Sequence, residues 1–486
     1  MRRRTGIVIG ACAALALAAT AGAVASGSAG EQPAGVWHEA SAVERTPVSA
    51  RGKATAAPSG KPDRAARPET TAPTGTDPSV PGRSAGRESA GRGSAGRGSA
   101  TGKPTDEKAT AGAGTPRKGQ DARLESAATS RQRVGELLRV EKLLGYLAGP
   151  QTETFRYPGA SYVKVHFDRM AMAPGDHVTV SNPEKTESYR YDAPAAVDTG
   201  GADRWAMSIT GDTAVVEVHR AADPLGLGAA LGSLGVHVDR VARGYTRTEQ
   251  RREKAGRAGP GREESVCGVD SSTDAVCYRS ADPVAYTKSK AIARLLINGT
   301  ELCTGWRVGA KNRMITNNHC LTSSEEAYDT EVWFNYQCAT CGGYDVFKPT
   351  KVWGDKVLAT DKVLDFTLFS VDGFASVEKF GYLTLDTVRP IKGQELYVPQ
   401  HPAGEPTRIA GGQGDKAGNC AVEDPAYTGY AAQSDVSYYC DTAGGSSGSP
   451  VLSRATNRVV ALHHFGGCPN SGVRGDLLAA KLRTYL

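Results

Sequence analysis

Cysteine is missing from more than half of this 486-residue chain. None lies between residues 26 and 266, whereas nine of the ten cysteines fall between Cys267 and Cys468. Disulfides can therefore staple only the C-terminal part, which this clustering marks as a separate unit. After the first 25 residues the chain also lacks an apolar run long enough to span a bilayer, so we expect no later membrane anchor.

The sequence also has little of what nucleic-acid-binding proteins need. Its formal net charge of +6 comes largely from arginines and lysines scattered through low-complexity segments. We find no basic helix and no basic patch with interleaved aromatic residues. This pattern indicates a solvated basic tail, and we expect no nucleic-acid partner.

The first residues have the pattern of a secretory signal peptide. A basic stretch at residues 2–4 precedes an apolar stretch at 7–19 and small residues at 23–25. We expect residues 1–25 to be removed and the protein to be secreted, extracellular and free of the membrane. Residues 26–120 are rich in Gly, Ala, Ser, Thr, Pro, Arg and Lys, so we expect them to be disordered.

Three further segments precede the cysteine-rich part. Residues 121–150 place Val134, Leu137, Leu138 and Leu144 at helical spacing, which predicts a helix. Residues 151–245 alternate apolar and polar positions between turn signals, which predicts a small β-sandwich. Residues 246–264 are basic and predict a flexible linker open to proteolytic processing. We expect a compact domain at 265–486.

The chemistry of the C-terminal part is concentrated in three places. Ser447 lies between glycines in the run Gly-Ser-Ser-Gly-Ser-Pro at 445–450, a turn that can present a nucleophile. His319 is followed by Cys320, and Asp365 lies between apolar residues of a predicted strand. A serine nucleophile needs a general base, and the base needs an orienting carboxylate. The rival aspartates are Asp355 and Asp361, and the rival serines are Ser446 and Ser449.

The chain order of these groups is His, Asp, Ser, which is the order of chymotrypsin. Residues 267–486 resemble the chymotrypsin-like (trypsin-like) serine endopeptidases, nearer to the bacterial lysyl and glutamyl endopeptidases than to animal trypsins. The resemblance rests on Cys303-Thr-Gly, His319-Cys320, Asp365-Phe-Thr-Leu, Gln400-His-Pro and the glycine turn at 445–450. Ser446 departs from the animal pattern, in which an aspartate pairs with a freshly cut N-terminus.

This resemblance implies an all-β fold of two six-stranded barrels with a short C-terminal helix. It also implies a His319–Asp365–Ser447 triad, with the backbone N–H groups of Gly445 and Ser447 as the oxyanion hole. The implied disulfides are Cys267–Cys468, Cys277–Cys341, Cys303–Cys320 and Cys420–Cys440, which leaves Cys338 over. We expect protein or peptide substrates, no cofactor and no metal, because Cys338 and Cys341 form a CxxC without further ligands.

Substrate preference stays open at this stage. Asp441 lies six residues before Ser447, the register at which trypsin-like enzymes hold a Lys or Arg side chain. Thr442 with His463 or His464 resembles instead the carboxylate-binding residues of glutamyl endopeptidases. Because Asp441 would repel a glutamate, basic residues are favoured, with glutamate as the alternative. A third reading is a catalytically silent, disulfide-stapled binding protein, and residues 151–245 could be a pro-region cut away before the protease domain.

Overall fold

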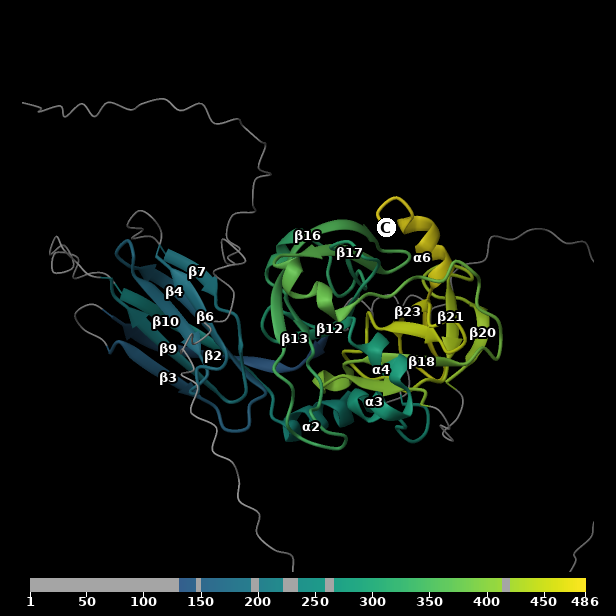
Figure 1. Ribbon diagram of the computed structural model, residues 1–486, viewed down its shortest axis with the longest axis horizontal. Coiled ribbons are helices and arrows are strands. Elements are labelled where there is room, and N and C mark those ends of the chain that lie inside the picture. Colours follow the sequence, from purple (N-terminus) through teal and green to yellow (C-terminus); the bar gives the residue numbers. More distant parts are fainter. Residues whose placement is uncertain (1–130, 146–149, 194–200, 222–234, 258–265, 413–419) are drawn as a thin grey trace, which may run out of the picture. The chain divides into compact units, whose positions relative to one another are not determined.

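The computed structural model describes residues 131–145, 150–193, 201–221, 235–257, 266–412 and 420–486. The predicted signal peptide and low-complexity segment lie outside this part of the chain. The described residues fold mainly as strands, in a β-sandwich followed by two β-barrels (Figure 1). None of the helices in the described ranges is long and apolar enough to cross a membrane.

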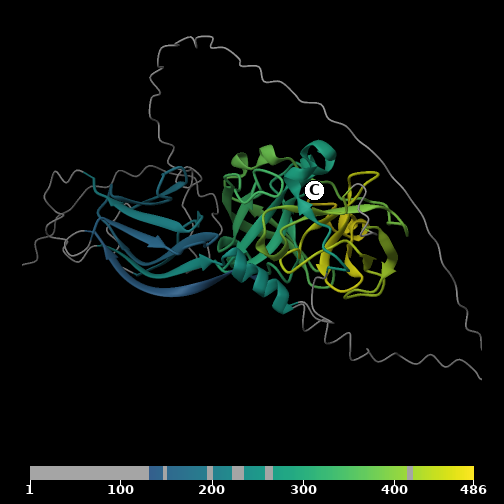
Figure 2. The same cartoon turned by 90° about the horizontal axis from the view of Figure 1, so that it is seen from below.

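The predicted β-sandwich is present. In the described part of the chain, one of its sheets has the order β2-β10-β4-β7 with β8 beside β4, and the other has the order β3-β9-β5-β6. Figure 2 shows these strands in two layers, whose facing side chains share one apolar core. The strands are β2 (Gly135–Leu144), β3 (Thr152–Arg156), β4 (Tyr162–Ala171), β5 (His177–Ser181), β6 (Ser188–Asp192), β7 (Gly201–Trp205), β8 (Ile209–Thr210), β9 (Thr213–His219) and β10 (Gly235–Gly244).

The helix predicted for residues 121–150 is wrong for its described part. Residues 132–144 form the strands β1 (Gln132–Arg133) and β2. Leu137 is 51% exposed, although the helical pattern would bury it. Strand β2 pairs along its length with β10, and this long-range pairing decides the structure of a segment whose local pattern fits a helix.

The first barrel closes through six antiparallel strands. In the described residues they run β13-β12-β15-β16-β17-β14, and β14 returns to pair with β13. Strand β1 joins this barrel at β13, rather than the sandwich that follows it. The strands are β12 (Ile292–Ile297), β13 (Glu301–Arg307), β14 (Met314–Thr316), β15 (Glu331–Phe334), β16 (Thr350–Asp361) and β17 (Phe366–Val371).

The second barrel lies beside the first, and apolar residues of both pack into one cluster (Figure 1). In the described part its sheet has the order β11-β19-β18-β22-β23-β24-β21-β20. A backbone contact of Leu396 with Cys420 brings β18 back to the start of β20. The strands are β11 (Thr273–Asp274), β18 (Leu396–Gln400), β19 (Arg408–Ala410), β20 (Val422–Tyr427), β21 (Asp435–Tyr438), β22 (Pro450–Ser453), β23 (Val459–Phe465) and β24 (Asn470–Arg474).

Short helices connect and close these sheets. The predicted C-terminal helix is α6, which buries Leu478 and Leu482 against β23 and β24. The helices are α2 (Arg247–Arg257), α3 (Tyr278–Ala281), α4 (Pro283–Ser289), α5 (Ser324–Tyr328) and α6 (Gly475–Leu482), with 3-10 turns η2 (Ala275–Cys277), η3 (Phe374–Ser376), η4 (Glu378–Phe380) and η5 (Pro402–Gly404).

The basic segment predicted as a flexible linker begins instead with the helix α2, so the expectation that the chain has no basic helix is also wrong. Thr246 and Glu249 form a reciprocal cap, because the Thr246 N–H donates to the Glu249 carboxylate (2.7 Å) and the Glu249 N–H donates to Thr246 Oγ1 (3.3 Å). Arg243 donates to the same carboxylate. This Thr-x-x-Glu signal was present in the sequence, but the density of basic residues obscured it.

Buried charges join the sandwich to the first barrel. Glu331 of β15 is fully buried and binds Lys164 Nζ (2.8 Å) of β4 and the hydroxyl of Ser208 (2.5 Å). Lys351 of β16 is also fully buried and binds Glu187 (2.7 Å) of the sandwich. Burial alone would raise the pKa of Glu331, but the two lysines hold it below its usual range.

Apolar packing covers these ion pairs. Trp353 of the first barrel belongs to the core cluster of the sandwich. Tyr162 of the sandwich packs edge-on against Trp333 of the barrel. The described sandwich and barrel therefore share a continuous interior. Such an interior is typical of a permanent association.

Candidate active site

The predicted histidine and aspartate come from neighbouring strands of the first barrel. His319 follows β14 and Asp365 immediately precedes β17, and the two strands pair through Thr316 and Thr367. The Asp365 carboxylate accepts hydrogen bonds from His319 Nδ1 (2.8 Å) and from the His319 backbone N–H (3.0 Å). His319 Nε2 is buried and has no hydrogen-bond partner among the described residues. That nitrogen is therefore free to take a proton.

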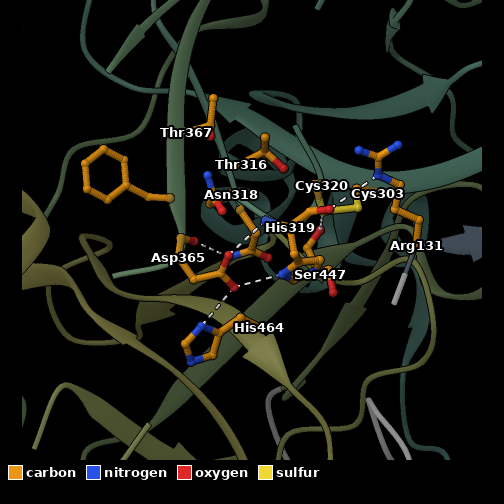
Figure 3. Close-up of polar contacts among 12 residues, drawn as sticks. Arg131, Cys303, Thr316, Asn318, His319, Cys320, Asp365, Thr367, Ser447 and His464 are labelled. Atoms are coloured by element: carbon orange, nitrogen blue, oxygen red, sulfur yellow. Dashed lines mark hydrogen bonds and ion pairs between the residues drawn. A yellow bond between two sulfur atoms is a disulfide. The ribbon is translucent and has the colours of Figure 1, made fainter. Parts of the chain in front are cut away.

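The serine comes from the second barrel, on the turn that leads into β22. Gly445 and Gly448 have positive φ angles of 96° and 87°. A Cβ on Gly448 would lie 2.0 Å from the carbonyl oxygen of Thr304, so only glycine fits there. The Thr304 N–H donates to the carbonyl of Ser447 (2.9 Å), which ties the turn to β13 of the first barrel. Figure 3 shows Ser447, His319 and Asp365 together where the barrels meet.

A second histidine lies behind Asp365, a position the sequence analysis did not foresee. His464 of β23 contacts Asp365 through Nδ1 (3.2 Å) and Asp435 of β21 through Nε2 (2.6 Å). Burial would lower the pKa of His464, but the two carboxylates raise it to about 9. His464 is therefore a protonated bridge between two buried carboxylates (Figure 3). Both of its ring nitrogens are engaged by these carboxylates, so the ring has no nitrogen left for the substrate carboxylate that the resemblance suggested.

The hydrogen bonds at Asp365 favour ionisation of its carboxyl group. Burial alone would raise the pKa of Asp365, but donors from His319 and His464 hold it well below its usual range. Asn317 also positions this residue, because its side-chain amide donates to the Asp365 carbonyl (2.9 Å). Asn317 is fully buried and was not among the residues predicted from the sequence. The rival aspartates bind elsewhere, Asp361 to Lys481 and Asp355 to Ser370.

Asp441 is engaged by the chain's own backbone. Its carboxylate accepts hydrogen bonds from the Cys267 N–H (3.2 Å), the Ser271 N–H (2.9 Å) and the Ser271 hydroxyl (2.6 Å). Asp441 as a whole residue is 5% exposed. With three donors already in place, Asp441 anchors the start of the two-barrel domain and has little capacity left for a lysine or arginine.

Thr442 and His463, unlike Asp441, each have a buried polar atom that is not engaged by the described residues. Thr442 Oγ1 and His463 Nε2 are both buried without a hydrogen-bond partner in the described part of the chain. The hydroxyl of Tyr438 lies 2.7 Å from His463 Nδ1. Burial, with the nearby charge of His464, lowers the pKa of His463 to about 3, so this ring is neutral at ordinary pH. Buried polar atoms without partners are uncommon, and a ligand can supply one.

The structure contains the four disulfides that the resemblance implied. Within the described residues they are Cys267–Cys468, Cys277–Cys341, Cys303–Cys320 and Cys420–Cys440. Cys338 is the free, buried cysteine of this part, and burial raises the pKa of its thiol to about 11. The described side chains close enough to share a metal ion are Cys303, His319 and Cys320, but the two sulfurs are already bonded to each other.

Comparison with protein families agrees with this geometry. Residues 303–462 match the family model of the trypsin-like peptidase domain, a span that contains His319, Asp365 and Ser447. Residues 303–462 thus carry a trypsin-like peptidase domain. Peptidases are hydrolases, and the two barrels around this span are those that the resemblance predicted.

Two curated relatives match part of the chain. It is 40% identical over 232 residues to secreted RxLR effector protein 73 of Plasmopara viticola, covering 46% of this chain and 56% of that protein. It is 27% identical over 198 residues to an uncharacterized protein of Sinorhizobium fredii (strain NBRC 101917 / NGR234), covering 37% of this chain and 28% of that protein. The chain thus spans about half of the first relative's length and about a quarter of the second's.

Solved structures of proteases are also similar to the peptidase domain. One is a Glu endopeptidase, at 19% identity and a TM-score of 0.34, covering 45% of this chain and 98% of that chain. Another is the active form of the Rv3671c protease from M. tuberculosis, at 13% identity and a TM-score of 0.30, covering 42% and 85%.

Proposed function

We propose that this protein is an exported serine endopeptidase that uses His319, Asp365 and Ser447. The observation that carries the proposal is the His319 ring, held by Asp365 at Nδ1 and free at the buried Nε2, beside Ser447 in a trypsin-like domain. In the reaction, His319 Nε2 takes the proton of Ser447 Oγ while Oγ attacks the substrate carbonyl carbon. The backbone N–H groups of Gly445 and Ser447 would hold the resulting oxyanion.

The second half of the reaction returns the enzyme to its starting state. His319 gives its proton to the departing amine as the peptide C–N bond breaks, which leaves an acyl group on Ser447. Water then attacks this ester, and His319 again accepts and returns the proton. Asp365 stays ionised throughout, because its neighbours hold its pKa low, and it stabilises the imidazolium form of His319.

The contacts of the candidate substrate-binding residues Asp441, Thr442 and His463 support cleavage after glutamate rather than after basic residues. Glutamate was the alternative named from the sequence. Asp441 is already bound by three donors of its own chain. If the hydroxyl of Tyr438 donates to Nδ1 of His463, the ring proton sits on Nε2, where it can donate to a carboxylate. Thr442 Oγ1 supplies a second unpartnered hydroxyl. Two neutral donors suit a glutamate side chain.

This specificity is tested with quenched peptides that differ only in the residue before the scissile bond. We expect the Glu peptide to be cut faster than the Lys and Arg peptides. His463→Leu should lower kcat/KM for the Glu peptide by about tenfold to a hundredfold, because a hydrogen bond to a charged group contributes about 1.5–3 kcal/mol. Asp441→Asn is the matched comparison. If it abolishes cleavage after Lys and Arg while His463→Leu changes nothing, the pocket is basic-specific.

Export and processing form part of the same proposal. The disulfides of the peptidase domain and the secreted character named for the Plasmopara viticola relative support an extracellular location. We retain a proteolytic cut between α2 and Cys267 as a proposal. The buried Lys164–Glu331 and Lys351–Glu187 pairs support a sandwich that stays bound after that cut, instead of a pro-region that is released.

The expected result of such a cut is two fragments that move together. After cleavage between residues 257 and 267, the sandwich and the peptidase domain should co-elute in size-exclusion chromatography. Glu331→Gln should loosen the complex, because it leaves Lys164 and Lys351 less compensated in a buried site. Glu217→Gln, which affects an exposed pair with Lys185, is the control. Separate elution of the wild-type fragments would instead support a released pro-region.

A further inference from the structure

The strand β1 lies on the same edge of β13 as the catalytic serine. One edge of β13 pairs with β12. Along the other edge, β14 pairs with residues 306–307, the carbonyl of Ser447 accepts from the Thr304 N–H, and β1 pairs with residues 301–302. At about 3.4 Å per residue, β1 begins roughly 7 Å along the strand from the contact with Ser447. The chain's own residues 131–134 therefore lie along the same strand edge as the turn that carries Ser447.

Arg131 lies between two carboxylates, next to the main chain of His319. Its guanidinium binds Glu301 (3.0 Å) and Glu326 (2.5 Å), and its Nε donates to the carbonyl of His319 (3.3 Å). The Arg131 side chain is only 16% exposed. Figure 3 shows the Arg131 side chain with its hydrogen bond to the main chain of His319. A cationic side chain is thus held directly against the main chain of the catalytic histidine.

Glu326 also has hydrogen-bond partners other than Arg131. Glu326, on α5, accepts hydrogen bonds from the Thr322 N–H (2.7 Å) and the Thr322 hydroxyl (2.6 Å). Burial alone would raise the pKa of Glu326. The donors from Arg131 and Thr322 have the larger, opposite effect, so its pKa lies below the usual value. Glu301 lies on β13 itself. Glu301 and Glu326 therefore project from two different elements of the first barrel, and Glu326 keeps its Thr322 donors without Arg131.

Residues 132–134, which contain β1, pack against glycines of the second barrel. Gln132 is 2% exposed, and its Oε1 would lie 2.0 Å from a Cβ at Gly444, next to the proposed oxyanion residue Gly445. Val134 would similarly crowd a Cβ at Gly404 of the second barrel. Glycine at 444 and 404 thus makes room for this strand. An extended peptide bound as an added strand is a common way for proteins to hold peptides.

We propose that Glu301 and Glu326 form a subsite for a basic side chain on the leaving-group side of the scissile bond, and that residues 131–134 occupy it as an internal substrate mimic. This inference rests on the proposed peptidase function. Thr442 and His463, the proposed acyl-side residues, belong to the second barrel, whereas Arg131 contacts the first barrel at His319. Substrates must displace β1, and those with Arg or Lys directly after the scissile bond replace its contacts.

The kinetic test uses three quenched peptides with Glu before the scissile bond and Arg, Ala or Glu after it. In the full chain, Arg131→Ala should raise kcat/KM for the Arg peptide at least about tenfold and make it at least tenfold better than the Glu-Glu peptide. Adding Glu301→Gln and Glu326→Gln should bring the three peptides close together. Arg190→Ala, which removes an exposed arginine of the sandwich, is the matched control. Equal rates for all three peptides in Arg131→Ala would overturn the subsite.

A binding test separates this subsite from catalysis. In the Ser447→Ala background, Arg131→Ala should bind a dye-labelled Arg-Gln-Arg-Val peptide, and adding Glu326→Gln should weaken binding at least about tenfold. If the peptide binds in this way but no variant with Ser447 hydrolyses any peptide, the subsite stands and the peptidase function fails. If peptides are hydrolysed but Glu326→Gln leaves both binding and preference unchanged, the subsite proposal fails.

Discussion

Ser447→Ala should reduce peptide hydrolysis by about 10⁴-fold or more while the protein still folds. The loss follows from removal of the nucleophile, which in triad enzymes leaves only the contributions of binding and the oxyanion hole. Folding should survive because the change removes a single oxygen and keeps the backbone hydrogen bond from the Thr304 N–H to the carbonyl of residue 447. The measurements are kcat on a quenched Glu peptide, and a non-reducing peptide map that should still give the Cys303–Cys320 linkage.

Ser449→Ala is the matched comparison for this variant. Ser449 lies two residues along the same turn and is fully buried, but it is not the residue that the glycine pattern presents. We expect Ser449→Ala to keep most of the activity. If Ser447→Ala keeps wild-type turnover and Ser449→Ala loses it, the nucleophile is Ser449 and the assignment to Ser447 is wrong.

His464→Ala should have the largest effect on stability. It removes the imidazolium between Asp365 and Asp435 and leaves two buried carboxylates without that partner. Breaking a buried ion pair in this way costs about 3–5 kcal/mol. We expect the midpoint of urea denaturation to fall accordingly. Activity should fall as well, because Asp365 loses a contact that orients it toward His319.

The loss of stability in His464→Ala should depend on pH. Because the folded state raises the pKa of His464 to about 9, its protonation stabilises the fold fully below the unfolded pKa of about 6.5. That stabilisation is lost as the pH rises through about 9. The stability gap between wild type and His464→Ala should therefore narrow from pH 6.5 to pH 9.

His401→Ala provides the control for that titration. Burial lowers the pKa of His401 to about 3, so the folded ring is neutral throughout this range, while the unfolded ring loses its remaining charge just above its pKa of about 6.5. The stability gap for His401→Ala should therefore change by only about 0.4 kcal/mol between pH 6.5 and pH 9. A His464→Ala gap that is equally constant over this range would show that His464 is not a charged bridge.

Short-range signals in the sequence were sufficient for several features. The glycine turn around Ser447 and the His319-Cys320 pair are local patterns with a steric or covalent cause, and the structure places them together. The alternation at Val163, Val165 and Phe167 reflects a sheet with one face in a core. The disulfide pairs came from the resemblance to a family, since cysteine spacing alone allows many connectivities.

Long-range contacts decided the features that the sequence did not predict. Strand β2 owes its structure to β10, which follows about one hundred residues later. His464 meets Asp365 across 99 residues of sequence, and neither neighbourhood indicates the contact. Asp441 lies at the sequence position of a specificity residue, but its carboxylate already accepts hydrogen bonds from the N–H and hydroxyl of Ser271. In each case the local pattern fitted two outcomes, and a partner distant in sequence selected one.

Covalent labelling with a fluorophosphonate tests the central claim most directly. The full-length protein should gain one phosphonyl adduct, and peptide mapping should place it on Ser447. The adduct should be absent in His319→Ala, because the unassisted hydroxyl is a weak nucleophile. A folded protein that takes no label, or that is labelled at another serine independently of His319, would contradict the proposed peptidase.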